Sequence, residues 1–429
     1  MIRRVRASLA TVVMKNWAGN VTYSTAGILR PRTVEEAQEL VARTASIRPL
    51  GTRHSFSLVA DSTGALLSTE HLDRVVEIGA DTVTVEAGIR YGELGRALQE
   101  NGLAVANLAS LPHISVGGAI ATGTHGSGVS NQSLAAAVSA LELVSADGSI
   151  NRLRRGDPDF DGAVVALGAL GLVSRVSLDV LPAFEVRQYV FEDLPWRAVE
   201  TDLDEILAGG YSVSLFTTWT EPAIAQVWLK TTEELHTKSY FGAVPATVPR
   251  NPVPGAPPDN CTEQLGVPGP SAERLPHFRL GFTPSGGAEL QSEYVVPREH
   301  GADALRALRG LGRIVSPLLL ISEIRTIAAD TLWLSPFFER DSVAFHFTWK
   351  PLGDEVLAVL PLIEAALEPF GVRPHWGKLF AGSPRQFEAA YPKLPAFREL
   401  RQRFDPDGKF QNAFVARHIS GDEPAQPGT

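Results

Sequence analysis

The stretch Gly51-Thr52-Arg53-His54-Ser55 joins a glycine to small hydroxyl residues and one histidine, and two later stretches share its character. These are Ser115-Val116-Gly117-Gly118-Ala119 and Gly123-Thr124-His125-Gly126. Loops of this composition let backbone N–H groups close on a diphosphate without charged side chains. His54 lies inside the first loop, where its imidazole can reach a bound ligand. Three such loops, with strand patterns between them, indicate a nucleotide site rather than a set of ordinary turns.

The familiar nucleotide motifs are missing from the sequence. No Gly-x-x-x-x-Gly-Lys-Ser/Thr is present, which excludes a P-loop. No Gly-x-Gly-x-x-Gly follows a strand pattern, which argues against a Rossmann site. A nucleotide held by a different fold is the interpretation that remains.

Composition limits the partners of the protein. The chain has 429 residues, 44% of them hydrophobic and 20% charged, which is enough for two or three globular domains. A net charge of −9 argues against nucleic acid and against an anionic membrane surface as partners. No apolar run approaches the roughly 20 residues of a transmembrane helix. The single cysteine, Cys261, excludes an intramolecular disulfide and a thiol-rich metal site, and we expect no metal ion.

The N-terminus resembles a signal peptide only weakly. The apolar stretch Ala7 to Val13 is short, and no small-x-small cleavage site follows it before Trp17. Met14 looks like a natural start, so residues 1–13 are interpreted as an upstream extension or a flexible leader. We expect residues 420–429 to be flexible too, and the protein to be a cytoplasmic monomer.

Short strands and helices interleave over residues 19–184, which predicts an α+β domain. The helix at Pro31–Ala42 is expected to begin after Thr33, an N-cap with Glu36 three residues on. The other expected elements are strands at Ile47–Leu50, Thr82–Ala87 and Leu172–Leu181, a helix at Tyr91–Glu100, and a hairpin that begins with Val138–Ser145 and turns at Asp147-Gly148.

Residues 185–418 read as a second domain, with a large antiparallel sheet flanked by helices. The expected strands are Tyr189–Phe191, Ser212–Trp219, Ala225–Lys230, Phe278–Phe282, Ser292–Val296, Leu318–Ile327 and Ser342–Trp349. The expected helices are Pro195–Leu207, Gly301–Arg309 and Val356–Leu367. Residues 245–276 contain nine prolines, so they form either a solvated surface excursion or a rim over the substrate entrance.

Three polar clusters stand in apolar surroundings in this second domain. Glu323 and Arg325 lie two apart and so share one face of a strand. His346, Thr348 and Lys350 share a face of another strand, and His375-Trp376-Gly377-Lys378 adds an imidazole and an ammonium. Each pair taken singly reads as a surface ion pair. Their apolar neighbours favour a binding site, in which a polyhydroxyl ligand supplies the hydrogen bonds that buried charges need.

These loops resemble the flavin domain of the vanillyl-alcohol oxidase superfamily, of the p-cresol methylhydroxylase type, whose members often tether FAD through such a histidine. Over nearly its whole length the chain is similar to bacterial alditol oxidases, and Phe404 to Asn412 resembles their closing segment, which folds back on the flavin domain. The resemblance implies a two-domain flavoprotein with one FAD per chain, attached covalently to His54. The residues implied to hold FAD are Pro49, Leu50, Gly51, Thr52, Arg53, His54, Ser55, Ser110, Ser115, Gly118, Thr122, Gly123, Thr124, His125, Val173 and His375.

The resemblance also implies a substrate site and a reaction. Ser110, Glu323, Arg325, Thr348 and Lys378 would hold a polyol, with His346 close by and His375 against the flavin ring. The terminal hydroxyl of an alditol such as xylitol or sorbitol would be oxidised to the aldose, with dioxygen reduced to hydrogen peroxide. Lys378, desolvated beside Arg325, would either accept the hydroxyl proton or only position the alkoxide, while Glu323 orients Arg325. Ala109 is small enough to leave room for oxygen, or it serves loop packing.

Two alternative functions stay open on the sequence. One is an aldonolactone oxidase acting on a ring substrate such as gulono- or galactonolactone. The other is an FAD-dependent sugar-alcohol dehydrogenase that passes electrons to a protein or a quinone instead of oxygen. A binding module without activity is disfavoured, because polar residues opposite a flavin site have little use in a scaffold.

Overall fold

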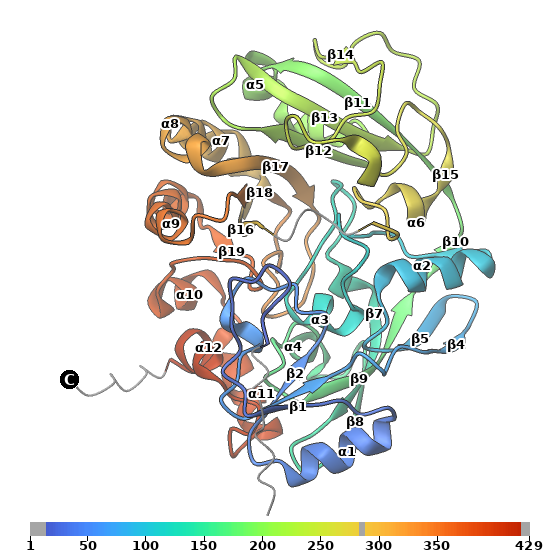
Figure 1. Ribbon diagram of the computed structural model, residues 1–429, viewed down its shortest axis with the longest axis vertical. Helices are drawn as coiled ribbons and strands as arrows, with labels where there is room; N and C mark the ends of the chain where they lie inside the picture. Colours follow the sequence, from blue (N-terminus) through green and yellow to red (C-terminus); the bar gives the residue numbers. More distant parts are fainter. Residues whose placement is uncertain (1–13, 283–287, 422–429) are drawn as a thin grey trace, which may run out of the picture.

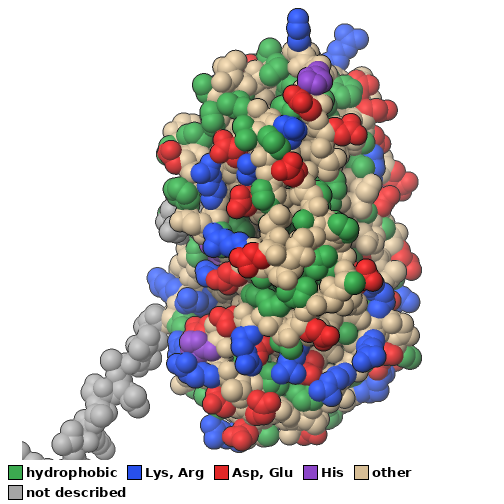
Figure 2. All heavy atoms as spheres, turned by 90° about the vertical axis from the view of Figure 1, so that its right-hand side faces the viewer, with side chains coloured by type: hydrophobic (Ala, Val, Ile, Leu, Met, Phe, Trp, Pro, Cys, Tyr) green, Lys and Arg blue, Asp and Glu red, His purple; other side chains and the backbone are tan. Residues whose placement is uncertain are grey.

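The computed structural model describes residues 14–282 and 288–421, which form two parts stacked along the long axis (Figure 1). The predictions for residues 1–13 and for the end of the chain concern residues outside these ranges, apart from Ser420 and Gly421. Over the face seen in Figure 2, acidic and basic side chains intermingle without a large region of one sign. No helix in the described ranges is long and apolar enough to cross a membrane.

A small parallel sheet carries the first glycine-rich loop. Its strands, in the order β1-β3-β2, are β1 (Gly27–Leu29), β3 (Ala65–Ser68) and β2 (Ile47–Leu50). Helix α1 (Val34–Arg43) begins as predicted, because the Thr33 side chain accepts a hydrogen bond from the Glu36 N–H at 3.2 Å. The glycine-rich loop leaves β2 at Leu50, so the end of a rigid strand sets its position.

A five-stranded antiparallel sheet forms the rest of the first part, in the order β4-β5-β9-β7-β8. Buried and half-buried residues alternate along β9, so one face of this strand packs against the core. The predicted hairpin is confirmed as β7 paired with β8. The remaining helices and strands of the first part are β4 (Val75–Ile78), β5 (Thr82–Glu86), α2 (Tyr91–Glu100), β6 (Leu103–Ala104), α3 (Val116–Ala121), β7 (Val138–Val144), β8 (Ile150–Arg154), α4 (Phe160–Val164), β9 (Leu172–Asp179) and β10 (Leu181–Pro182).

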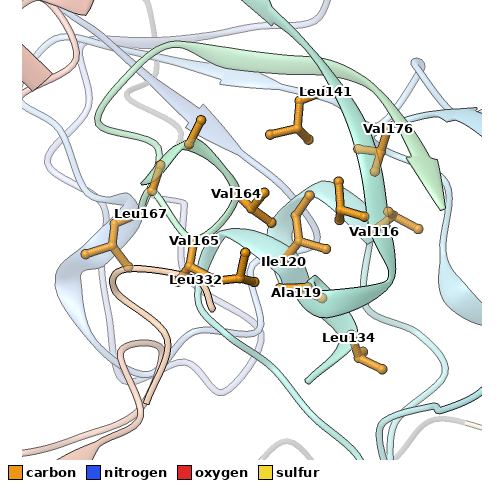
Figure 3. Packing of buried hydrophobic residues seen from close by; sticks show 14 of the residues in the cluster. Val116, Ala119, Ile120, Leu134, Leu141, Val164, Val165, Leu167, Val176 and Leu332 are labelled. Carbon is orange, nitrogen blue, oxygen red and sulfur yellow. The ribbon is translucent and has the colours of Figure 1, made fainter. Parts of the chain in front are cut away.

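Helix α3 lies at the centre of the core of this part (Figure 3). Val116 and Ile120 are fully buried there, beside Leu141 of β7 and Val176 of β9. Leu332, from the segment between the last two long strands of the second part, packs into the same cluster. Residues of the second part therefore complete the core of the first part.

The second part is built on a nine-stranded sheet in the order β14-β11-β13-β12-β17-β18-β16-β19, with β15 paired to β11. Every pairing in it is antiparallel, as predicted. Its strands are β11 (Glu185–Pro195), β12 (Ser212–Thr217), β13 (Ala223–Thr231), β14 (Val244–Pro245), β15 (Gly269–Pro270), β16 (Leu290–Pro297), β17 (Leu319–Ile327), β18 (Ser342–Trp349) and β19 (Arg373–Pro374).

The two faces of this sheet differ in what covers them. Helices α5 (Trp196–Ala208), α7 (Gly301–Gly310) and α9 (Gly353–Leu367) cover one face with an apolar layer, as predicted. On the other face, Phe216 and Trp228 pack against Ala246 and Cys261 of the proline-rich segment. This second face turns toward the glycine-rich loops of the first part.

One predicted strand, Phe278–Phe282, is wrong. The structure has only an isolated bridge between Cys261 and Phe278, and the Phe282 N–H then turns back to the Arg279 carbonyl at 3.3 Å. The N–H of Phe278 donates to the Ser110 carbonyl at 3.2 Å, so this segment bonds to the first part instead of joining a sheet. Alternating apolar residues gave the strand pattern, but within the described part of the chain Phe278 to Phe282 pair with a neighbouring segment only at this one bridge.

The last segments of the chain lie against the first part. Helices α10 (Pro384–Ala390) and α11 (Leu394–Phe404) and the short α12 (Ala413–Val415) contribute side chains to the core around α3. The Asn412 side chain donates to the carbonyls of Val59 and Asp61, beside the first glycine-rich loop. The division into domains at residue 184 stays a prediction, with β10 ending at Pro182 and β11 beginning at Glu185.

Candidate active site

One large cavity lies between the glycine-rich loops and the open face of the nine-stranded sheet. Its empty space is about 2020 Å³, a figure that includes the open mouth of the cavity. Of the residues expected to hold FAD, those that line it are Pro49, Leu50, Gly51, Thr52, Arg53, His54, Ser55, Ser110, Gly118, Thr122, Thr124, His125, Val173 and His375. The glycine-rich loops and the polar face of the sheet therefore line one continuous cavity.

The first glycine-rich loop presents unpaired backbone donors to this cavity. The N–H groups of residues 52–55 have no hydrogen-bond partner within residues 14–282 and 288–421. Arg53 takes a left-handed conformation, with φ of 65°, a backbone geometry that recurs in anion-binding loops. N–H groups left free in such a loop can donate to the oxygens of a diphosphate.

Gly51 and Gly118 let the first two loops approach closely. A Cβ atom on Gly51 would lie 2.6 Å from the Ser115 hydroxyl, and one on Gly118 would lie 2.9 Å from the same oxygen. Ser115 thus stands behind the wall of the cavity, with its hydroxyl buried and unpaired among the described residues. Gly123 also lies behind the wall, in a left-handed conformation against Pro336. This close packing of the loops suits a ligand that is bound by the backbone N–H groups of the protein.

His54 is held at the cavity wall with one free nitrogen. Its ring stacks on Trp17 with the centroids 5.3 Å apart, and its Nδ1 is buried without a partner among the described residues. Burial lowers the pKa of His54 to about 4, and the positive charges of His113 and Arg53 act in the same direction. The imidazole is therefore neutral at physiological pH, and the lone pair that a covalent bond would use is not protonated.

Polar side chains form a row across the face of the sheet that lines the cavity. Glu323 of β17 lies directly opposite His346 of β18, which lies opposite Glu293 of β16. Arg325 and Thr348 line the cavity two residues further along their strands. The row is almost completely buried, since each of these five side chains is less than 10% exposed. Lys350, expected beside Thr348, is exposed instead and donates to the Pro317 carbonyl.

Glu293 is the central anion of this row. Its Oε1 accepts from Arg325 Nη2 at 2.6 Å, and its Oε2 accepts from Lys378 Nζ at 2.5 Å. His125 Nε2 lies 3.3 Å from the same carboxylate. Burial alone would raise the pKa of Glu293, but the charges of Lys378 and Arg325 hold it well below its ordinary value. Glu293 is therefore ionised and fixes the directions of both cations.

Glu323 has a different partner from the one expected. Its Oε1 accepts from His277 Nε2 at 2.8 Å, whereas the nearest nitrogen of Arg325 lies 3.6 Å away. Arg325 instead reaches Glu293 and places its Nη1 at 3.3 Å from the Ser110 hydroxyl. Glu293, rather than Glu323, therefore orients Arg325.

Lys378 is placed by two strong contacts. Besides Glu293, its Nζ lies 2.6 Å from His346 Nδ1, and His346 Nε2 lies 3.0 Å from the Thr348 hydroxyl. Burial lowers the pKa of Lys378, with Glu293 opposing this shift and Arg325 adding to it. Burial, with the charge of Lys378 added, lowers the pKa of His346 to about 4. Burial and Arg325 thus favour the neutral amine of Lys378, whereas Glu293 favours its charged form.

The segment that carries His375 and Lys378 is tied directly to the loop of His54. The Phe56 N–H donates to the Gly377 carbonyl and the Ser57 hydroxyl donates to the Trp376 carbonyl, both at 2.7 Å. His375 is buried at the cavity wall, and its Nδ1 accepts from the Gly377 N–H at 3.1 Å. Two stretches more than 300 residues apart in sequence thus meet at one end of the cavity.

Known proteins match both halves of the chain. Residues 25–154 match a family of FAD binding domains, and residues 288–418 match the D-arabinono-1,4-lactone oxidase family. An alditol oxidase of Streptomyces sp. (strain IKD472 / FERM P-14339) is 50% identical over 416 residues, which cover 96% of this chain and 100% of that protein. The chain belongs to the alditol oxidase family. It is an FAD-dependent oxidoreductase.

More distant relatives of this alditol oxidase family member are named as enzymes that oxidise lactones. An L-gulono-1,4-lactone dehydrogenase of Mycobacterium tuberculosis is 28% identical, over 94% of this chain and 98% of that protein. An L-gulonolactone oxidase of Mus musculus is 27% identical, over 95% and 98%. The fold is shared more widely, because a cholesterol oxidase from B. sterolicum superposes with a TM-score of 0.76 at 17% identity, over 95% of this chain and 96% of that chain.

The sequence patterns did not identify Glu293, His277 or Lys230 as residues of the site. Glu293 lies within the strand pattern Ser292–Val296, where a single carboxylate among apolar residues could have indicated a functional role. His277 lies at the end of the proline-rich segment, and Lys230 ends a strand pattern. No group of three or more potential metal ligands is clustered in the described part of the chain.

Replacing Glu293 by glutamine should lower the free energy of unfolding by about 3–5 kcal/mol at pH 7, because Arg325 and Lys378 lose their common buried partner. The pKa of Glu293 lies below its ordinary value of 4.5 in the folded protein. The difference between wild type and variant is therefore complete above that pH and shrinks as the pH falls below it. Urea denaturation at several pH values measures it. The exposed control Glu299→Gln should change little, and equal effects at both positions would contradict the central role of Glu293.

Proposed function

We propose that this protein oxidises the terminal hydroxyl of alditols such as xylitol and sorbitol to the aldose, with dioxygen reduced to hydrogen peroxide. The observation that carries the proposal is the buried polar row, which faces the glycine-rich loops across one cavity. The relative of 50% identity is named alditol oxidase, which supports the same substrate class.

The polar groups suit an open-chain polyol. Arg325 and Lys378 are donors, the free oxygen of Glu323 is an acceptor, and the hydroxyls of Ser110 and Thr348 can be either. They lie on two strands and two loops, so they can meet hydroxyl groups spaced along a chain. We propose these five residues as the substrate-binding set, with Lys378, Arg325, Glu323 and His346 as the residues that act on the reacting end.

FAD, when bound, accepts a hydride from the substrate carbon and passes electrons on to dioxygen. The hydroxyl proton must go to a group of the protein, and we propose Lys378 as its acceptor. Two of the positions around Nζ are directed at Glu293 and His346, and the remaining one is free for the substrate. In the neutral amine this third position is a lone pair that takes the proton, whereas in the ammonium it is a donor that only positions the alkoxide.

We further propose that FAD is bound covalently through His54 and that the sixteen cofactor residues named from the sequence hold it. The neutral ring, its free Nδ1 and its place in the loop with unpaired N–H groups support this linkage. Residues 19–184 would be the FAD-binding domain and residues 185–418 the substrate domain. Ala109 lines the cavity beside Ser110, consistent with room for oxygen there. The monomeric state and the cellular location stay predictions from the sequence.

Peroxide release separates the three candidate reactions. Purified protein with air should produce peroxide with xylitol and sorbitol far faster than with glycerol, because a site that pairs each hydroxyl discriminates against ligands that lack them, by up to ~10⁴. Gulonolactone should be a poor substrate. A faster rate with gulonolactone would establish the lactone oxidase, and reduction of a quinone or dye without peroxide would establish the dehydrogenase.

The covalent link has a direct chemical test. Acid-precipitated wild-type protein should give a yellow pellet, since a histidyl bond survives denaturation. The His54→Ala variant should give a colourless pellet, with any flavin left in the supernatant. The variant His71→Ala, on an exposed histidine, is the control and should stay yellow. A colourless wild-type pellet would refute the link.

Replacing Lys378 by methionine should slow anaerobic flavin reduction by xylitol by about 10²-fold or more, the usual contribution of a general base. Reoxidation of chemically reduced flavin by oxygen should change little. In the wild type, the rate of flavin reduction should rise with pH and level off below the ordinary lysine pKa of 10.5, because the base must be neutral and its pKa is lowered. A rate that falls as the pH rises would assign Lys378 as alkoxide anchor, and an unaltered variant would exclude both roles.

A further inference from the structure

His277 occupies the point where the proline-rich segment crosses the open face of the sheet. Its ring packs edge-on against Trp228 and Phe216, with centroids 5.1 Å and 5.7 Å away. Its backbone N–H donates to the Ser110 carbonyl at 3.1 Å. His277 is only 4% exposed, so the sheet, the segment and a cavity loop hold it from three sides.

A buried lysine stands behind this histidine. Lys230, on β13, has no exposed surface, and its Nζ contacts the Leu275 carbonyl, the Pro276 carbonyl at 3.1 Å and His277 Nδ1 at 3.0 Å. The three N–H bonds of an ammonium group thus meet three acceptors. Because Nδ1 accepts, the ring proton is on Nε2, which points at Glu323 Oε1 at 2.8 Å.

The last link of this chain of contacts faces the substrate cavity. Glu323 Oε1 is engaged by His277, whereas Oε2 has no hydrogen-bond partner among the residues that the structure describes. We propose that Lys230 is a positioning residue, which fixes the tautomer of His277 and thereby directs the free oxygen of Glu323 at a hydroxyl of the polyol. This inference rests on the proposed function for the identity of the ligand.

The electrostatics fit a neutral ring between Lys230 and the Glu323 carboxylate. Burial lowers the pKa of Lys230 to about 7, with Glu323 opposing this shift and Arg325 adding to it. Burial, with the charge of Lys230 added, lowers the pKa of His277 to about 4. Burial alone would raise the pKa of Glu323, but Arg325 and the His277 hydrogen bond hold it below its ordinary value. Among the described residues no carboxylate lies within hydrogen-bond distance of Lys230 Nζ, and the charge of Glu323, on the other side of the imidazole, favours the protonated amine. Removing Lys230 would free His277 to carry its proton on Nδ1, with Nε2 then facing Glu323 as a second acceptor.

The same contacts give the proline-rich segment a role at the site. Helix α6 (Ser271–Arg274) packs on α2, where a Cβ on Gly95 would lie 2.8 Å from the Ala272 side chain (Figure 1). Lys230 binds the two carbonyls that follow this helix. Pro252 and Val253 of the segment line the cavity as well. The segment is thus anchored on both parts of the molecule and carries His277 into the wall of the site.

The test compares Lys230→Met, His277→Gln and the double variant with Lys350→Met, a control on an exposed lysine of the adjacent sheet region. Anaerobic flavin reduction yields the xylitol dissociation constant and the limiting rate separately. Each single variant should weaken xylitol binding by about tenfold or more, the value of one hydrogen bond to a charged group, with a smaller change in limiting rate. The double variant should be no worse than His277→Gln, because Lys230 acts through His277. Additive losses, or a limiting rate that falls while binding holds, would overturn the proposal.

A second measurement needs no substrate, so it also decides if the protein fails to oxidise any polyol. Nitrogen-15 NMR of labelled histidine in the wild-type holoenzyme should show His277 with a proton on Nε2 and a bare Nδ1, the signals being assigned by their loss in His277→Gln. The Lys230→Met variant should lose this pattern at an unchanged flavin content. A wild-type ring protonated on Nδ1 would overturn the inference, even where Lys230→Met does not fold.

Discussion

The ion cluster around Glu293 is the constraint on which the rest of the site depends. A carboxylate without exposed surface can stay ionised only if cations reach it, and Arg325 and Lys378 come to it from different elements. Each cation has its direction fixed by this contact, and each lines the cavity. The cluster is therefore both a strong local requirement of the fold and the means by which two donors are aimed at one substrate.

The seam between the two parts serves the same end. The backbone bond from Phe56 to Gly377 joins the loop of His54 to the segment of Lys378, and the Ser110 carbonyl accepts from the segment of His277. Leu332 from the second part completes the core around α3. Because backbone hydrogen bonds and a shared core make this seam, the flavin loops and the polar row are held in register before any ligand binds.

On the open face of the sheet, the partners of the buried polar groups offset the free energy that is lost when these groups leave water. Each charged group has a partner of opposite sign or a hydrogen-bonded imidazole, from Lys230 through His277 and Glu323 to Glu293 and its cations. The groups left with free capacity, such as Oε2 of Glu323 and the third position around Lys378, belong to residues that line the cavity. A ligand rich in hydroxyls is the natural complement to such a surface.

Sequence by itself determined the elements and the face of each strand. Local patterns predict the N-cap at Thr33, the hairpin of β7 and β8 and the helices of the second part. They also predict that Glu323 and Arg325 lie on the same face of one strand. Tertiary structure alone decided which charges meet. Arg325 binds Glu293, 32 residues away, and His277 binds Glu323, 46 residues away, because strand register and the path of a proline-rich segment set those distances. Local periodicity carries no information about which strands pair, and for the same reason it predicted a strand at Phe278–Phe282, where the structure has only an isolated bridge.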